Sequence, residues 1–191
     1  MQNFKEFLAS LTARGAQLVA VSKTQSPEAV RELYDLGQRV FGENRVQELL
    51  PKRAALEEMG CTGIEWHLIG HLQRNKVRQI VPFVALIHSV DSLELLQTID
   101  KEAQRAGRAQ IDVLLQFHVA QEDTKFGLNW QEAAEICAQK NLLKSVRIVG
   151  AMGMATQTDD AEQIRREFEQ LRSYWSELKR LFFFEEASFS I

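Results

Sequence analysis

The chain has 191 residues, of which 45% are hydrophobic and 26% charged, the size and composition of one globular domain. Its net charge of -3 and pI near 5.9 give no electrostatic reason to expect a nucleic acid or an anionic membrane as partner. No apolar run approaches the roughly 18 residues that a membrane span requires.

The N-terminus is typical of a short amphipathic helix rather than of a signal peptide. Apolar side chains recur with helical spacing at Phe4, Phe7, Leu8 and Leu11, and Gly15 suits the helix end. The apolar core of a signal peptide is missing, and the two cysteines show no CxxC spacing. We therefore expect a cytoplasmic protein with reduced thiols.

Apolar, β-branched runs alternate with helical segments along the rest of the chain. The predicted strands are Leu18–Thr24, Arg39–Asn44, Ile64–Gly70, Ala85–Asp91, Ile111–Val119 and Val146–Ala155, with a further one over Glu186–Ile191. Ser26 and Pro27 predict a helix start, and Gly37 predicts its end. Pro51 predicts that the helix after the second strand is broken or short.

Capping residues indicate where three later helices begin. Asp91, Asn129 and Asp159 each precede a Glu by three residues, the spacing of a capping box. The longest helix follows Asp159 and carries an apolar stripe, for which we predict a continuous core-facing surface. The stripe consists of Ile164, Phe168, Leu171, Trp175 and Leu178.

Strands that alternate with helices predict βαβ units and a parallel sheet. A doubly wound nucleotide-binding sheet usually has a Gly-rich turn after its first strand, and the segment VAVSKTQSPE has none. We therefore expect an α/β fold of the (β/α)8 TIM-barrel type, with an extra N-terminal helix and with residues 1–191 in a single domain.

Lys23 is the first candidate for chemistry. Period-2 alternation places Val19, Val21 and Lys23 on one face of the first strand, so a lysine ends an apolar row at the carboxyl end. Functional groups of β/α barrels gather at that end, and a desolvated amine is a competent nucleophile toward an aldehyde. A lysine that extends into solvent fits the same pattern, and the pattern alone leaves both interpretations open.

Five motifs together resemble one known family. They are VAVSKT, FGENRVQE at Phe41–Glu48, WHLIGHLQRNK at Trp66–Lys76, TKFG at Thr124–Gly127 and GAMGMAT at Gly150–Thr156. In order and spacing they are similar to the pyridoxal-phosphate (PLP) homeostasis family, and the similarity extends from residue 18 to the end. The resemblance implies a barrel related to the N-terminal domain of alanine racemase, with PLP held as a Schiff base on Lys23.

The resemblance also implies further cofactor-binding residues. Asn44 would lie beside the cofactor, His67 and Ile69 would share a strand face beneath its ring, and Met152 would present an apolar edge. A helix-capping Asn44 and a core Met152 are the alternatives. His67 and His71 are four residues apart, but His67 falls in a predicted strand, so we expect no metal site. No catalytic residue is assigned.

Two functions compete on this basis. The first is a PLP carrier or regulator in intracellular PLP (vitamin B6) and amino-acid homeostasis, without clear turnover; the second is a PLP-dependent amino-acid racemase. A two-base racemase needs a second acid or base, and Tyr34 and Tyr174 both fall in predicted helices, which favours the carrier. A barrel that binds another phosphorylated ligand, with Lys23 as a charge contact, is a third alternative.

The family resemblance also sets expectations about completeness and partners. In the family, a last strand and phosphate-binding loops follow the segment that matches the end of this chain, so we expect a barrel that is incomplete at its C-terminus. PLP-dependent apo-enzymes are candidate partners, and we expect a monomer that binds neither nucleic acid nor membrane.

Overall fold

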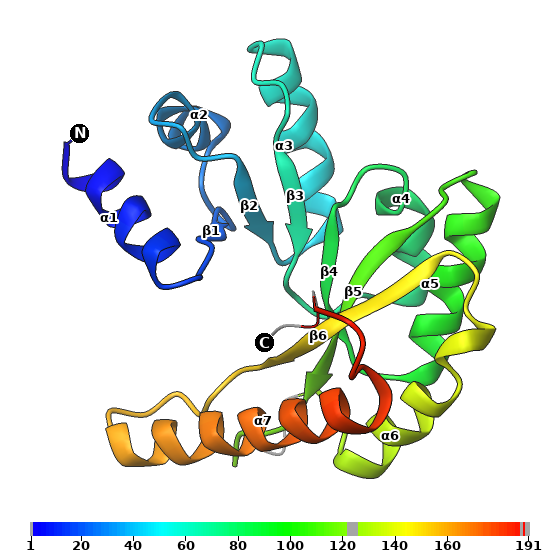
Figure 1. Ribbon diagram of the computed structural model, residues 1–191. Helices are drawn as coiled ribbons and strands as arrows, with labels where there is room; N and C mark the ends of the chain where they lie inside the picture. The colour runs from blue at the N-terminus through cyan, green and yellow to red at the C-terminus, as the bar shows by residue number, and fades with distance from the viewer. Residues whose placement is uncertain (1, 122–125, 188, 190–191) are drawn as a thin grey trace.

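The strands form one parallel sheet in the computed structural model, which describes residues 2–121, 126–187 and 189 (Figure 1). Their order in the sheet is their order in the chain, as in a β/α barrel. They are β1 (Ala20–Val21), β2 (Val40–Glu43), β3 (Glu65–Leu68), β4 (Leu86–Val90), β5 (Ile111–Phe117) and β6 (Val146–Gly153). Since neighbouring strands all pair in parallel, their carboxyl ends lie at one edge of the sheet.

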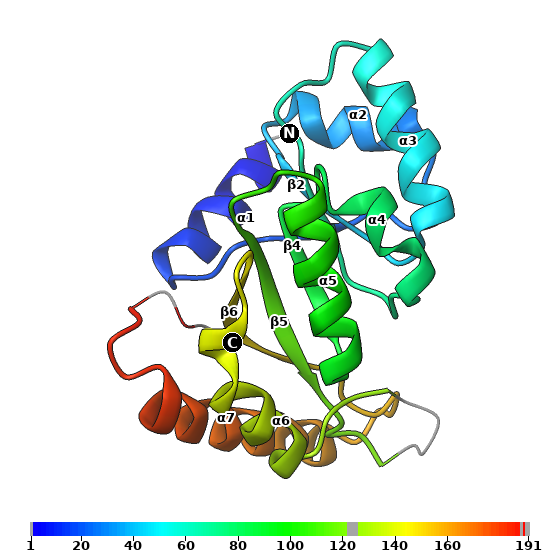
Figure 2. The ribbon, with the colours of Figure 1, turned by 90° about the vertical axis from the view of Figure 1, so that its right-hand side faces the viewer.

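Helices connect successive strands, and α3, α4 and α5 lie side by side along one face of the sheet (Figure 2). The α-helices are α1 (Gln2–Ala13), α2 (Pro27–Asp35), α3 (Val46–Glu58), α4 (Val77–Ile80), α5 (Leu93–Arg105), α6 (Trp130–Ala138) and α7 (Ala161–Phe182). The described connections also contain the 3-10 helices η1 (Arg74–Lys76) and η2 (Lys140–Leu142). Among the described residues, none of the helices combines the length and the apolar character needed to cross a membrane.

Alternation along the strands divides the sheet into two faces. Phe41 and Trp66 belong to the core beneath the helices, with ring centroids 6.1 Å apart. His67 lies between two of these core positions, Trp66 and Leu68, and therefore faces the opposite way, where it contacts His88 of β4. This second face corresponds to the interior of a barrel.

The N-terminal helix is confirmed, but its apolar face is not buried. Gly15 has a φ of 71° and ends α1, while the Ala16 N–H donates to the Leu11 carbonyl in a Schellman-type closure. Phe7 of the predicted apolar face remains 47% exposed.

Pro51 does not break its helix. It lies inside α3, which runs without interruption for 13 residues. The missing N–H removes one hydrogen bond, but Leu49 and Leu56 on the same helix are fully buried. Tertiary packing therefore outweighs the local preference of proline.

Helix starts agree with the sequence in two cases and differ by one residue in two others. Ser26 caps α2 as predicted, and Asn129 forms the predicted capping box on α6. However, Ser92 caps α5 in place of Asp91, and Asp160 caps α7 in place of Asp159. In both cases two residues that can cap a helix follow one another in the sequence. The spacing to the Glu predicted the first of them, whereas the second is the N-cap.

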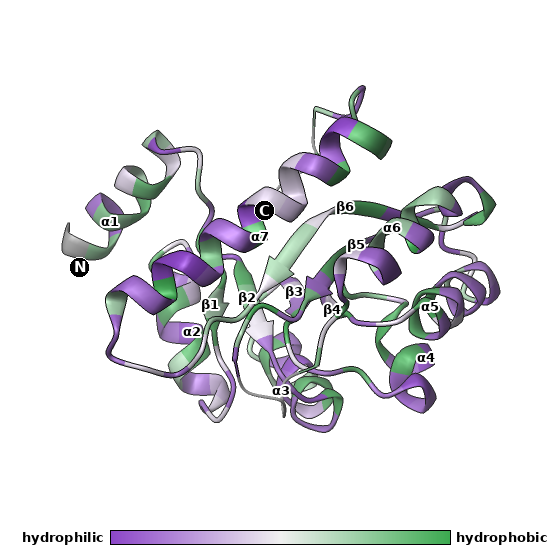
Figure 3. Cartoon of the chain, turned by 90° about the horizontal axis from the view of Figure 1, so that it is seen from below, coloured by the Kyte–Doolittle hydropathy of each residue, from purple (hydrophilic) through white to green (hydrophobic). Residues whose placement is uncertain are grey.

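The last predicted helix is present, but its apolar stripe is only partly buried. Leu171 and Leu178 of α7 are buried, whereas Phe168 is 46% exposed. Figure 3 shows hydrophilic residues recurring between hydrophobic ones along α7. The predicted seventh strand is not found at its described positions, since the Phe189 N–H closes a turn on the Glu186 carbonyl. Its residues 188, 190 and 191 lie outside the described part of the chain.

Candidate functional site

The predicted site residues lie at or near the carboxyl edge of the sheet. Lys23 follows β1 by two residues, and Asn44 and Ile69 come directly after β2 and β3. His67 lies in the second half of β3, and Met152 is the last residue but one of β6. In β/α barrels this edge carries the functional groups, so the topology brings the candidate residues to the expected place.

Several of these residues share the interior face of the sheet. A Cβ added at Gly42 would lie 3.1 Å from Cγ1 of Val19 and 3.1 Å from Cδ1 of Ile69. Val19, directly before β1, and Ile69, directly after β3, thus converge over Gly42 of β2. His67 faces the same way, being two residues before Ile69. Because Gly42 has no side chain, it does not crowd the surface between Val19 and Ile69.

Met152 lies beside a cavity on the sheet. Together with His88 and Leu114 it lines a cavity of about 710 Å³ between the sheet and Trp175 of α7. Met152 is half-buried in the structure. Its place in the lining of the cavity is compatible with the predicted role as an apolar edge.

A pair of histidines lies on the interior face. Nδ1 of His67 and Nε2 of His88 are 2.9 Å apart, and the ring centroids are separated by 5.0 Å. Burial lowers the pKa of each to about 4, and for His88 the proximity of His67 adds to the effect. Both rings are thus neutral at pH 7, and one donates a single N–H to the other. Sequence reasoning did not identify His88 as a partner of His67 and so missed this pair.

Lys23 is exposed and lies in a turn, which corrects one step of the sequence argument. The strand β1 ends at Val21, so the alternation of the strand does not extend to the lysine. Ser22 to Gln25 form a β-turn, closed by a 3.1 Å hydrogen bond from the Gln25 N–H to the Ser22 carbonyl. The amine is presented by a turn at the sheet edge rather than desolvated at the end of a strand.

Asn44 is held close to the loop that follows β3. A Cβ added at Gly70 would lie 2.5 Å from the Asn44 carbonyl oxygen, so only glycine permits this approach. Arg45, not Asn44, is the N-cap of α3, which excludes the capping alternative. Asn44 instead lines a pocket of about 480 Å³ together with residues that include His71 and Lys76.

His67 and His71, the two histidines of the WHLIGH segment, make different contacts. Nδ1 of His71 lies 2.9 Å from Oδ2 of Asp91, and the His71 ring stacks on Phe126 with a centroid distance of 4.1 Å. His67 faces His88 instead. The stack joins the third motif to the fourth, TKFG, of which Thr124 and Lys125 lie outside the described residues.

Comparison with known proteins identifies the family. The domain described as "Alanine racemase, N-terminal domain" matches residues 1–190. The pyridoxal phosphate homeostasis protein of Aquifex aeolicus is 39% identical over 165 residues, which cover 86% of this chain and 71% of that protein. The chain belongs to the pyridoxal phosphate homeostasis protein family. The resemblance inferred from the five motifs is thereby confirmed.

Solved structures agree with this family. PipY of Synechococcus elongatus, solved with PLP bound, is 37% identical, with a TM-score of 0.82 over 93% of this chain and 82% of PipY. Alanine racemase of Clostridium difficile is 17% identical, with a TM-score of 0.64 over 91% of this chain and 44% of the racemase, a likeness of fold alone. The α/β barrel-type fold is confirmed; the strand pairing that would close the barrel is not among the described residues.

Proposed function

We propose that residues 1–191 form a single PLP-binding unit that holds the cofactor as a Schiff base on Lys23. The role we propose is in intracellular PLP (vitamin B6) and amino-acid homeostasis, in the cytoplasm and without rapid turnover. The supporting observation is an exposed Lys23 on a turn at the carboxyl edge, in a chain 37% identical to a relative solved with PLP. A monomer that delivers PLP to apo-enzymes is the finer form of this proposal.

The residues around Lys23 suit a pyridine aldehyde. Ile69 and Val19 offer an apolar surface over Gly42, on which a flat ring can pack. The neutral imidazole of His67 adds no charge beneath such a ring. Asn44 and Met152 would contribute an amide and a thioether at the rim. Bound PLP would supply the aldehyde that condenses with the Lys23 amine.

A racemase is supported less well, because both tyrosines already have structural contacts. The Tyr34 hydroxyl donates to the Thr62 carbonyl at 2.9 Å. The Tyr174 ring packs against Phe117 and Trp130, and its hydroxyl accepts a hydrogen bond from a glutamine of α7. Both tyrosines are thus held by structural contacts of their helices, which does not favour either as the second acid or base of a two-base mechanism.

The decisive experiment maps the cofactor linkage. The chain is mixed with PLP, its visible absorption is recorded, and borohydride reduction is followed by peptide mass mapping. We expect a band that is fixed by reduction at Lys23 and lost in Lys23→Ala, but kept in Lys76→Ala, a matched lysine of the neighbouring pocket. Reduction at Lys76, or at no defined lysine, would overturn the proposal.

The same preparation separates carrier from racemase. Exchange of the α-proton of an L-amino acid in deuterated water is followed by NMR, with Lys23→Ala as control. The carrier role predicts no exchange beyond that control, whereas Lys23-dependent exchange at enzymatic rates would favour the racemase.

A further inference from the structure

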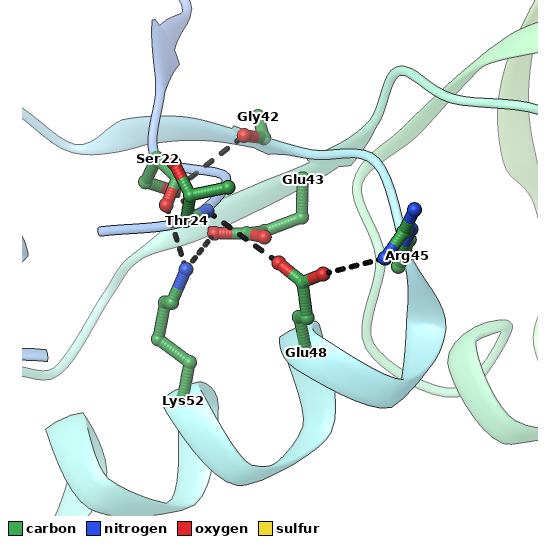
Figure 4. Close-up of polar contacts among 7 residues, drawn as sticks. All are labelled: Ser22, Thr24, Gly42, Glu43, Arg45, Glu48 and Lys52. Atoms are coloured by element: carbon green, nitrogen blue, oxygen red, sulfur yellow. Dashed lines mark hydrogen bonds and ion pairs between the residues drawn. The ribbon is translucent and has the colours of Figure 1, made fainter. Parts of the chain in front are cut away.

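A buried ion pair lies beside the turn that carries Lys23 (Figure 4). Nζ of Lys52 on α3 is 2.5 Å from Oε1 of Glu43 on β2, and their side chains are 7% and 0% exposed. The same Nζ donates to the Ser22 carbonyl at 2.6 Å, and the Ser22 hydroxyl donates to Glu43 Oε1 at 2.7 Å. The three residues close a ring of contacts around the peptide directly before Lys23.

Stability alone does not account for this arrangement. Two charges taken out of water lose hydration, and the Coulomb attraction recovers that loss only partly, so apolar replacements of such pairs are often as stable. In addition, Oε2 of Glu43 is buried without a hydrogen-bond partner among the described residues. The pair is therefore better explained by the backbone that it holds than by the free energy that it contributes.

The backbone that it holds is strained. Thr24 has a φ of 63°, unusual for a β-branched residue, at the turn position that type II turns usually give to Gly or Asn. The Ser22 carbonyl accepts from both Lys52 and Gln25, which fixes the start of the turn. Oε2 of Glu48, also on α3, accepts a long 3.5 Å hydrogen bond from the Thr24 N–H. Contacts from β2 and α3 thus hold both sides of Lys23.

We propose that Glu43 and Lys52 are positioning residues that set the direction in which the Lys23 amine leaves the sheet edge. This inference rests on the proposed function, since the reaction in question is imine formation. The unprotonated amine attacks the aldehyde carbon, a C=N bond replaces the C=O bond, and the two amine protons leave with the oxygen as water. A strained turn without its restraints would relax, and the amine would reach the aldehyde less often.

The test compares the parent chain with Glu43→Leu/Lys52→Met, which removes both charges and leaves neither partner uncompensated. Imine formation with PLP is measured by stopped-flow absorbance, and thermal unfolding is measured in parallel. We expect imine formation at Lys23 to slow about tenfold. The matched control is Lys140→Met at the amino edge of the sheet. Like Lys52, Lys140 donates to a glutamate (Glu186) and to a backbone carbonyl (Phe182). This variant should leave the rate within about twofold, whatever its effect on unfolding.

Hydrogen exchange of the Gln25 amide supplies a readout that is independent of PLP. Its N–H closes the turn, so we expect exchange to be about tenfold faster in the double variant. If the double variant does not fold, Ser22→Ala takes its place. This change removes only the hydroxyl contact with Glu43, so we expect exchange of the Gln25 amide to become about threefold faster. Unchanged exchange and an unchanged imine rate would overturn the positioning role. A parent chain that forms no imine would overturn the proposed function, and exchange alone would then decide the positioning role.

Discussion

The two ends of the sheet are held in different ways. At the first end, β1 has 2 residues and β2 has 4, and buried polar contacts fix the chain where Lys23 follows. At the other end, β5 and β6 have 7 and 8 residues and pair along most of their length, with apolar side chains such as Leu115 and Ala151 buried between sheet and helices. Where hydrogen bonds between strands are few, side-chain contacts determine the backbone.

This difference has a consequence for mutation. A long strand pair distributes its stability over many contacts, so the loss of one side chain leaves the backbone in place. A turn held by three polar side chains depends on each of them. Changes near β1 should therefore affect the reactivity of Lys23, and changes near β5 should affect mainly stability.

The largest effect is expected at Lys52. The variant Lys52→Met leaves the Glu43 carboxylate buried and uncompensated, which should lower the free energy of unfolding by about 3–5 kcal/mol. Urea unfolding followed by circular dichroism measures this change. A loss below about 1 kcal/mol would mean that the Glu43 carboxylate does not depend on Lys52 for compensation.

A core truncation at the other end of the sheet should lower stability and leave the reactivity of Lys23 unchanged. Leu115→Ala removes a fully buried side chain from β5 and should cost about 2–5 kcal/mol. The borohydride-trapped fraction at Lys23, measured below the unfolding transition, should stay within about twofold of the parent. A large drop in trapping would show that the two ends of the sheet are coupled.

The histidine pair between the two ends makes stability depend on pH. The pKa values of folded His67 and His88 are about 4, below the ordinary value of 6.5, so the unfolded chain binds more protons between these limits. Stability should fall as the pH is lowered, by on the order of 2 kcal/mol for each histidine from pH 7 to pH 5. The control His67→Phe/His88→Leu should show a flatter dependence; parallel curves would contradict the assignment.

The smallest effect is expected at Thr24. Thr24→Gly removes the side chain that disfavours a φ of 63° and should raise the free energy of unfolding by up to about 1 kcal/mol. The same change should slow imine formation at Lys23, because the freed turn samples more conformations. A variant that is more stable and also forms the imine faster would show that the strained turn at Thr24 does not help to position Lys23.

Motif and alternation patterns predicted most of the fold, because strand and helix periods are local properties of the sequence. They placed Asn44, Ile69 and Met152 at the carboxyl edge, where the structure has them. They failed at the end of β1, where Thr24 turns the chain although the residue type favours a strand. Local patterns cannot detect a conformation that distant contacts impose.

The buried pair was beyond sequence reasoning for a related reason. Glu43 and Lys52 are nine residues apart on different elements, and both residue types are normally exposed. The contact between His67 and His88 was missed in the same way, since it depends on how two strands are aligned. Such pairs become apparent only when the register of the sheet is known.

The ring formed by Ser22, Glu43 and Lys52 also constrains how this sequence can diverge. A substitution at position 43 or 52 alone should produce a poorly folded intermediate, whereas a paired change to apolar residues should not. The two positions should therefore show strong epistasis. A library that randomises either one singly would return few folded members, and one that randomises both together would recover apolar pairs.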